Sequence, residues 1–243
     1  MALLRYPLVL FDAGDTLVCP RESFGAVYAR VLSTFGVSLS ASDLERGLRA
    51  CWAATNGALA PGTDRYASDQ GGEAGYWLRF VEGTLARTPG APSDREFAAT
   101  AMTALREAFR DPRTWMVFPD VLPVLVELRQ AGARLGIVSN WDSSLPALLD
   151  RLGLASWFDT IVVSHLEGME KPRPELFLRA VERLSGTPDE TLHVGDVPEL
   201  DEAGATAAGI ASVIVDRRSR LPAVRNALQD LSTLPGIVRD GCV

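Results

Sequence analysis

Lysine is almost missing from this chain of 243 residues. Lysine and arginine together number 24, and Lys171 is the one lysine among them. Lysine carries a compact point charge, whereas arginine presents a wide planar fork. In a chain that otherwise uses arginine, we therefore expect Lys171 to occupy a position that arginine cannot fill.

Cysteine is also scarce. Cys19, Cys51 and Cys242 are scattered, and no CxxC or zinc-binding spacing is present. This pattern favours a reducing compartment. The apolar N-terminal stretch is short and runs into Asp12 and Asp15. It therefore fits neither a signal peptide nor a membrane span, and we expect a cytoplasmic protein.

Basic blocks and nucleotide-binding loops are absent as well. The net charge is −7, and no lysine- or arginine-rich run occurs. This balance argues against nucleic acid or an anionic membrane as the main partner. The GxGxxG and GxxxxGK[ST] loops are both missing, so nucleotide binding by those routes has no support. A small anionic substrate remains possible, because a local basic pocket can lie within an acidic protein.

The size and composition are those of an ordinary globular protein. The apolar fraction is 47% and the charged fraction is 23%. A chain of this length fits one large domain, or one domain that carries a sizeable insertion.

Three short apolar runs each end on a reactive polar residue. Asp12 follows Leu8–Phe11, Ser139 ends the run from Arg134, and Asp196 follows Thr191–Gly195. Each run reads as a buried strand. Ligands of open parallel α/β sheets bind beyond the carboxyl ends of the strands. We therefore expect these three side chains to meet in one crevice.

After the first strand, the pattern is helical for roughly a hundred residues. Ser93 and Glu96 have the spacing of a capping box at the start of the fourth helix. Gly/Pro/Ser-rich stretches separate the helices. The sequence predicts a four-helix insertion over residues 18–113. The expected helices are Glu22–Phe35, Ser42–Thr55, Glu73–Ala86 and Ser93–Phe109.

Strands and helices then alternate, which predicts an α/β fold with a doubly wound parallel sheet. The core domain would comprise residues 1–17 and 114–243, with residues 216–243 forming a peripheral turn and a short helix. The expected strands are Arg134–Ser139, Thr160–Ser164, Thr191–Gly195 and Ala211–Val215. The expected helices are Asp120–Ala131, Asp142–Leu152, Pro174–Ser185 and Pro198–Ala208.

Four motifs resemble those of the haloacid dehalogenase (HAD) superfamily and stand in the same order. Phe11–Leu17 (FDAGDTL) is similar to the first motif, usually D-x-D-x-T-L, and Val138–Asn140 is similar to the second. Lys171–Phe177 and Gly195–Asp201 (G-D-x-x-x-x-D) are similar to the third and fourth. The resemblance implies a Rossmann-like core with an inserted helical cap of the C1 type.

The resemblance also implies a role for each motif residue. Asp12 would be the nucleophile, and Lys171 would neutralise charge between it and a phosphoryl group. The implied phosphate-binding residues are Ser139, Asn140 and Lys171. The implied ligands of a Mg²⁺ ion are Asp12, the Gly14 carbonyl, Asp196 and Asp201. Asp201 would act directly or through a neighbour, and its position early in a helix is also favoured by the helix dipole.

Gly14 departs from the family pattern. HAD phosphatases carry a second aspartate at this place, and it protonates the leaving group. Asp15, one residue later, is the candidate substitute, because Gly14 tolerates unusual dihedral angles and lets the loop turn Asp15 inward. The equally weighted alternative is that Asp15 caps the loop. Members with D-x-x-D-T-L as first motif, which include proteins of unassigned activity, resemble this chain most.

Three functions remain after these comparisons. The first is a Mg²⁺-dependent phosphatase for a small phosphorylated metabolite, with Asp12, Asp15 and Lys171 as catalytic residues. The second is a phospho-ligand-binding or interaction protein with impaired catalysis, because the second aspartate is missing. The third is a 2-haloacid dehalogenase, against which Asp196 and Asp201 count, because that branch lacks the full fourth motif. A Schiff-base mechanism on a cap lysine is excluded, since Lys171 is the one lysine.

Overall fold

The computed structural model describes residues 4–221 and 227–241. The chain divides into two compact units, which are treated separately below. One unit comprises Met1–Cys19 and Val117–Val243, and the other comprises Pro20–Met116. The second unit is therefore an insertion within the first.

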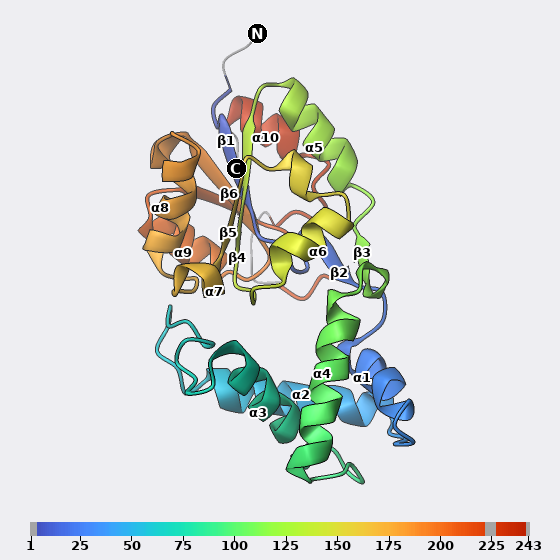
Figure 1. The fold of residues 1–243 in the computed structure, drawn as a ribbon. Coiled ribbons are helices and arrows are strands. Elements are labelled where there is room, and N and C mark those ends of the chain that lie inside the picture. Colours follow the sequence, from blue (N-terminus) through green and yellow to red (C-terminus); the bar gives the residue numbers. More distant parts are fainter. Residues whose placement is uncertain (1–3, 222–226, 242–243) are drawn as a thin grey trace. The chain divides into compact units, whose positions relative to one another are not determined.

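The first unit is built on a five-stranded sheet with the order β5-β4-β1-β6-β7 (Figure 1). Its strands are β1 (Leu8–Phe11), β4 (Arg134–Ser139), β5 (Thr160–Val163), β6 (Thr191–Gly195) and β7 (Ala211–Ile214). All four neighbouring pairs are parallel. The strand β1 is central and buried along its whole length, as its continuous apolar run predicts.

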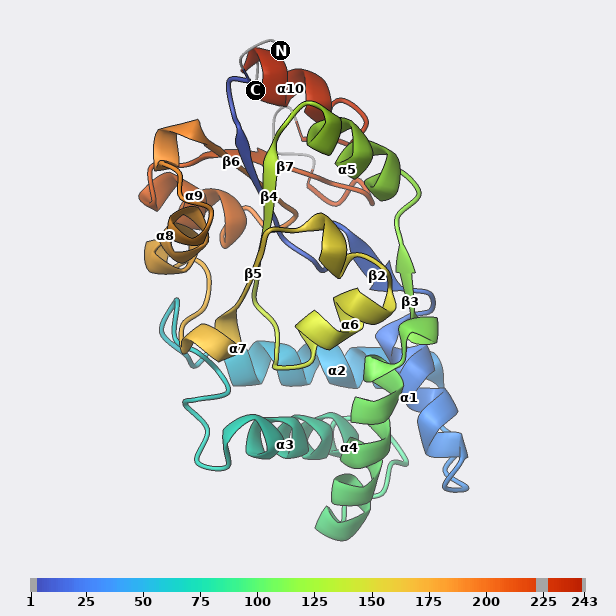
Figure 2. The ribbon, with the colours of Figure 1, turned by 45° about the horizontal axis from the view of Figure 1, so that its top comes forward.

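Helices cover both faces of this sheet (Figures 1 and 2). On one face lie α8 (Pro174–Arg183) and α9 (Asp201–Ala207), with the short α7 (Ser164–Glu167) beside them. On the other face lie α5 (Val121–Gln130), α6 (Leu145–Arg151) and α10 (Leu234–Asp240). This is the predicted α/β doubly wound fold.

The helix α8 shows how sequence sets this packing. Pro174 stands at its first turn, where a missing N–H costs nothing. Its apolar positions Leu176, Phe177, Ala180 and Val181 follow helical spacing and are buried. They form one core cluster with the side chains of Leu8, Leu10, Val138 and Val162 from the sheet.

A second, two-stranded sheet stands where the chain passes between the units. It pairs β2 (Val18–Pro20) with β3 (Trp115–Val117). Both unit boundaries, Cys19/Pro20 and Met116/Val117, fall inside these strands. The sequence analysis missed both strands, because three residues are too few to show a period-2 pattern. Short 3₁₀ turns lie at Pro112–Thr114, Ala155–Trp157 and Pro188–Glu190.

The inserted unit contains four α-helices. They are α1 (Phe24–Ser33), α2 (Ala41–Asn56), α3 (Gly72–Ala86) and α4 (Arg95–Arg110). Their apolar stripes share one core, which includes Leu44, Tyr76, Phe80 and Leu105. The Tyr76 side chain within this core is 3% exposed.

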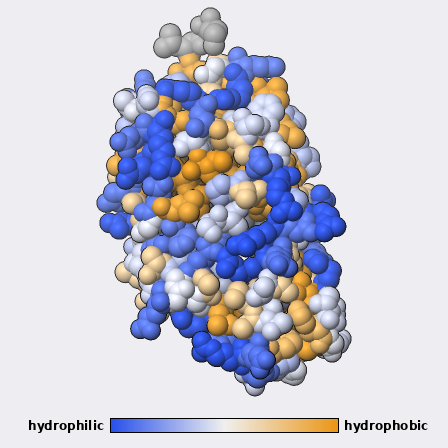
Figure 3. All heavy atoms as spheres, viewed as in Figure 1, coloured by the Kyte–Doolittle hydropathy of each residue, from blue (hydrophilic) through white to orange (hydrophobic). Residues whose placement is uncertain are grey.

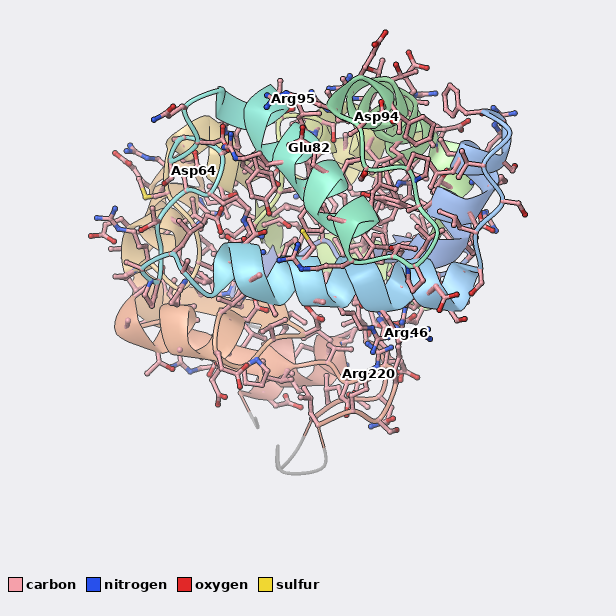
Figure 4. The ribbon with its side chains drawn as sticks, turned by 90° about the horizontal axis from the view of Figure 1, so that it is seen from below. Arg46, Asp64, Glu82, Asp94, Arg95 and Arg220 are labelled. Carbon is pink, nitrogen blue, oxygen red and sulfur yellow. The ribbon has the colours of Figure 1, made fainter. Side chains whose placement is uncertain are left out.

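The start of α4 corrects one detail. The spacing of Ser93 and Glu96 predicted a capping box, but the N-cap is Asp94, which accepts a hydrogen bond from the Phe97 N–H at 2.7 Å. Aspartate and serine cap equally well, so the spacing alone did not distinguish them. Figure 4 shows Arg95, the first residue of α4, beside Glu82 of α3, and their charged groups lie 3.6 Å apart.

Hydrophilic side chains cover much of the face drawn in Figure 3, with hydrophobic side chains in small groups between them. Among the described residues, no helix is both long and apolar enough to cross a bilayer.

Candidate active site

The polar ends of three neighbouring strands meet at one edge of the sheet. Asp12 follows β1, Ser139 ends β4, and Asp196 follows β6. Because β4, β1 and β6 are adjacent and parallel, their carboxyl ends lie together. The Asp12 backbone N–H donates to the Val194 carbonyl at 2.8 Å and so extends the pairing of β1 with β6. The structure therefore brings these residues together at the place where such sheets bind ligands.

Lys171 joins this group from the loop before α8. Its ammonium nitrogen Nζ lies 2.6 Å from Asp12 Oδ1 and 2.6 Å from Asp201 Oδ1. The Lys171 and Asp201 side chains are 2% and 1% exposed. Burial opposes the charge on Lys171, but the two carboxylates outweigh that effect and raise its pKa. The lone lysine is therefore a buried cation shared between two carboxylates.

The pKa values of the two carboxyl groups that share the Lys171 ammonium move in opposite directions. Burial raises the pKa of Asp12, and Lys171 and the Ser139 hydroxyl only partly oppose that rise. Burial also acts on Asp201, but Lys171 and His193 together hold the pKa of Asp201 below its usual value. Asp201 is thus the better compensated anion, and Asp12 is the one left with negative charge to share with a ligand.

Asp201 is surrounded by protein donors. Its Oδ1 lies 2.8 Å from His193 Nε2, and its Oδ2 accepts from the Val197 N–H at 3.0 Å. Gly195 permits this arrangement, because a Cβ atom at that position would overlap the Asp201 carboxylate. The direct role of Asp201 on a metal ion stays a prediction, while its contact with Lys171 is present in the structure.

The Asp196 carboxylate differs from that of Asp201 in its contacts. Within residues 4–221 and 227–241, no hydrogen bond or ion pair reaches its carboxylate. Burial and the carboxylates of Asp12 and Asp201 raise the pKa of Asp196 to about 8. A carboxyl group held in this way is uncompensated, and a cation beside it would relieve the repulsion.

The carboxylates at this site suit a hard divalent cation that takes only part of its ligands from the protein. The carboxylates of Asp12, Asp196 and Asp201 against the Lys171 ammonium leave a net charge of −2 when all are ionised. The described part of the chain has no group of three or more His, Cys, Asp or Glu side chains arranged to hold a metal. Mg²⁺ commonly takes one or two carboxylates and completes its shell with water. Asp12, Asp196 and, as the resemblance implies, the Gly14 carbonyl would therefore suit Mg²⁺ better than zinc.

Asn140 reaches Lys171 through the backbone. Its Oδ1 accepts from the Lys171 N–H at 2.7 Å, and its Nδ2 donates to the Lys171 carbonyl at 3.2 Å. The sequence assigned Asn140 to phosphate binding. In the structure, its side chain ties the second motif to the third and holds the main chain that carries the ammonium.

The loop after Asp12 places Gly14 and Asp15. A Cβ atom built on Gly14 would meet one atom within 4 Å, Cζ3 of Trp141 at 3.4 Å. Asp15 has a φ of 51°, in the left-handed region. Its Oδ1 accepts from Arg218 Nη2 at 2.9 Å. Whether Asp15 serves as acid and base stays a prediction, and its carboxylate here is engaged by an arginine.

Sequence reasoning missed two contributors to this loop. Arg217 and Arg218 lie in the segment that was expected to be peripheral, and both bond to the loop after Asp12. Nothing in the local pattern distinguishes them from the many other arginines, so only the fold reveals them. His193, on β6, is fully buried against Phe177 and Asp201.

Comparisons with known proteins show which family this chain resembles. A family model described as haloacid dehalogenase-like hydrolase matches residues 6–209. The human haloacid dehalogenase-like hydrolase domain-containing protein 3 is 30% identical, covering 96% of this chain and 92% of its own. A glyceraldehyde 3-phosphate phosphatase of Methanopyrus kandleri is 29% identical over 86% of this chain and 83% of its own.

The fold also matches solved structures. The HAD-hydrolase YfnB from Bacillus subtilis, in a magnesium-bound crystal form, aligns with a TM-score of 0.73 at 20% identity. The alignment covers 96% of this chain and 99% of that one.

Proposed function

The chain belongs to the haloacid dehalogenase-like hydrolases, and on that premise we propose that it hydrolyses a small phosphate monoester with Asp12 as nucleophile. The observation that carries the proposal is the buried Lys171 ammonium, 2.6 Å from Asp12 and anchored by Asp201 at the same distance. Such a cation suits a substrate whose transferred group is anionic. The phosphatase among the relatives supports the same class of reaction.

The covalent step follows from this geometry. One Asp12 oxygen attacks the phosphorus, a P–O bond to Asp12 forms, and the P–O bond to the alcohol breaks. The alcohol leaves with a proton from Asp15 or from water. Water then attacks the aspartyl phosphate, loses its proton to the same group, and releases inorganic phosphate with free Asp12.

The protein's own groups stabilise the phosphoryl oxygens. Lys171 supplies a fixed positive charge, and the Ser139 hydroxyl, which lowers the pKa of Asp12, would donate its hydrogen to a phosphoryl oxygen. Asn140 acts through the Lys171 backbone. Asp12, the Gly14 carbonyl and Asp196 would hold Mg²⁺, with Asp201 as the neighbour that the sequence included. When bound, Mg²⁺ supplies charge neutralisation between Asp12 and an anionic substrate.

The remaining roles follow the resemblance. The helical unit Pro20–Met116 is assigned the role of a cap that selects the substrate. We place the reaction in the cytoplasm, in keeping with the free thiols of Cys19 and Cys51. The partner is a small phosphorylated metabolite rather than nucleic acid or a membrane.

A second candidate, a phospho-ligand-binding protein with impaired catalysis, is favoured by one observation. Position 14, at which HAD phosphatases carry the aspartate that acts as acid and base, is a glycine and has no carboxyl group. Loss of a positioned acid and base costs about 10²–10⁴ in rate but leaves binding intact. The two candidates therefore differ in turnover and agree in phosphate binding.

The decisive experiment compares the parent, Asp12→Asn and Gly14→Asp on a panel of phosphorylated metabolites with Mg²⁺. We expect turnover by the parent, none by Asp12→Asn, and a gain of about tenfold or more for Gly14→Asp. The new side chain is accommodated, because Trp141 stands at ordinary contact distance from its Cβ. If the parent is as inactive as Asp12→Asn while Gly14→Asp gains activity, the binding protein is the better description. Chloride release from 2-chloropropionate without metal would instead establish the dehalogenase.

A further inference from the structure

The segment after β7 is folded against the loop that follows Asp12. Asp216 fixes this segment, because its two carboxylate oxygens accept from the N–H groups of Arg220 and Leu221 at 2.8 Å each. Two consecutive arginines, Arg217 and Arg218, stand inside the turn that Asp216 closes. Their backbone is therefore held in place independently of their side-chain contacts.

The side chain of Arg217 binds the backbone of this loop. Its Nε and Nη2 donate to the Thr16 carbonyl at 3.0 and 2.7 Å. Its Nη1 and Nη2 also donate to the two oxygens of Asp120, at 2.9 and 3.0 Å. The guanidinium lies 3.9 Å from the ring centroid of Phe118, and the side chain is 7% exposed. Only the rigid fork of arginine can reach the carbonyl and the carboxylate at once.

Arg218 binds the side chain of Asp15, the residue before Thr16. Its Nη2 lies 2.9 Å from Oδ1 of Asp15, which has left-handed backbone dihedrals. A non-glycine residue in that region is strained and persists where its surroundings fix it. The Asp15 N–H donates to the Val18 carbonyl at 2.8 Å, so backbone and side chain are both held.

The two residues that these arginines bind lie shortly after the proposed nucleophile in the sequence. Thr16 and Asp15 come after Gly14, and Asp12 lies two residues before that glycine. The loop is a tight turn in which the N–H groups of Leu17 and Val18 both donate to the Ala13 carbonyl, at 2.9 and 3.0 Å. A shift of the Thr16 carbonyl would therefore turn the peptide units on either side of Gly14.

We propose that Arg217 and Arg218 are positioning residues that hold the Asp12–Leu17 loop in the geometry required for phosphoryl transfer. The proposal rests on the proposed function of Asp12. Neither arginine touches the substrate in this role. Arg217 fixes the path of the loop, and Arg218 fixes the direction of the Asp15 carboxylate.

The first test measures the loop itself. Hydrogen–deuterium exchange of the amides of Asp15, Leu17 and Val18 is compared in the parent, Arg217→Gln and Asp159→Asn. The control removes a different bidentate ion pair of the same unit, between Asp159 and Arg129, at 2.6 and 3.0 Å. We expect exchange at least tenfold faster in Arg217→Gln and unchanged in the control. Unchanged exchange in Arg217→Gln would overturn the proposal.

The second test measures the catalytic consequence. With p-nitrophenyl phosphate and Mg²⁺, kcat of Arg217→Gln should fall by about 10²-fold, the scale of a misplacement near one ångström. The KM should change less, and Asp159→Asn, compared at equal unfolding free energy, should keep kcat within about twofold. A fall in kcat that matches the control would show a merely structural role. An inactive parent would count against the proposed function alone, since the exchange result stands without turnover.

A charge-matched pair separates Arg218 from general electrostatics. Arg218→Gln and Arg220→Gln remove the same charge from the same segment, on which Arg220 is exposed (Figure 4). We expect kcat to fall about tenfold in Arg218→Gln and to stay within about twofold in Arg220→Gln. Equal effects in the two variants would remove Arg218 from the proposal.

Discussion

The Lys171 ammonium lies 2.6 Å from the Asp201 carboxylate, and the pair is almost completely buried. Asp201→Ala would leave Lys171 with Asp12 as its remaining ion-pair partner. We expect the free energy of unfolding to fall by about 1–3 kcal/mol, because the buried His193 Nε2 and the Val197 N–H also lose the carboxylate that they contact. Urea denaturation measures this, with Glu202→Ala, the exposed neighbour on α9, as control. Equal losses in the two variants would show that the pair contributes no net stability.

Asn140 offers a test of how the Lys171 backbone is held. Asn140→Ala removes both side-chain bonds to that backbone, so we expect a loss of about 1–3 kcal/mol in unfolding free energy. We also expect weaker binding of inorganic phosphate by calorimetry. Asn140→Asp keeps the acceptor for the Lys171 N–H and should recover part of the stability. Phosphate affinity that is unchanged in Asn140→Ala would separate this residue from ligand binding.

The stability of the core should depend on pH through Asp120. Burial acts to raise the pKa of Asp120, but hydrogen bonds from Arg217 and from the Leu231 N–H hold it below its usual value. A carboxyl group with a lowered pKa in the folded state adds stability above its unfolded pKa, and this is lost as the pH falls through the folded value.

Asp120→Asn should therefore be less stable than the parent at pH 7, by about 1 kcal/mol after solvent screening. The two should converge as the pH falls from 5 towards 2. Urea midpoints across this range provide the measurement, with the exposed Asp189→Asn as control. A gap of constant size at every pH would assign the effect of Asp120 to something other than ionisation.

Two glycines should respond to alanine in opposite directions. At Gly195 the new Cβ would overlap the Asp201 carboxylate, so Gly195→Ala should cost about 1–3 kcal/mol and lower phosphate affinity. At Gly236, inside α10, no atom lies within 4 Å of the new Cβ. Gly236→Ala should therefore add about 0.4–1 kcal/mol. Thermal unfolding of both variants checks the pair, and a stabilised Gly195→Ala would contradict the packing described around Asp201.

Much of the core was legible in the sequence because its strands are buried on both faces. The runs Arg134–Ser139 and Thr191–Gly195 have the predicted bounds. The first ends at Ser139, and Asp196 directly follows the second. The importance of Lys171 was also legible, since its contrast with the arginines needs no knowledge of the fold. Each of these signals lies in a short stretch of sequence, so it can be read without knowing how the rest of the chain folds.

What could not be predicted are contacts between distant segments. Arg217 lies 201 positions from Thr16 in the sequence, and Asn140 lies 31 positions from Lys171. In each case the partner is a backbone atom, which every residue has, so residue types carry no signal of the contact. The bond of Asp15 to Arg218 joins two side chains, and it could not be predicted because any of many arginines would have fitted equally well.

The pairing of β2 with β3 brings the two ends of the helical insertion beside each other, where the Arg21 N–H donates to the Thr114 carbonyl at 2.9 Å. The chain between Arg21 and Thr114 can be regarded as one long loop whose two ends are held together by the pairing of β2 with β3. The entropic cost of closing a loop grows only slowly with its length. Evolution is therefore free to swap, enlarge or trim this module with little disturbance to the five-stranded sheet and its strand ends, and a protein engineer can graft foreign helices at the same two positions.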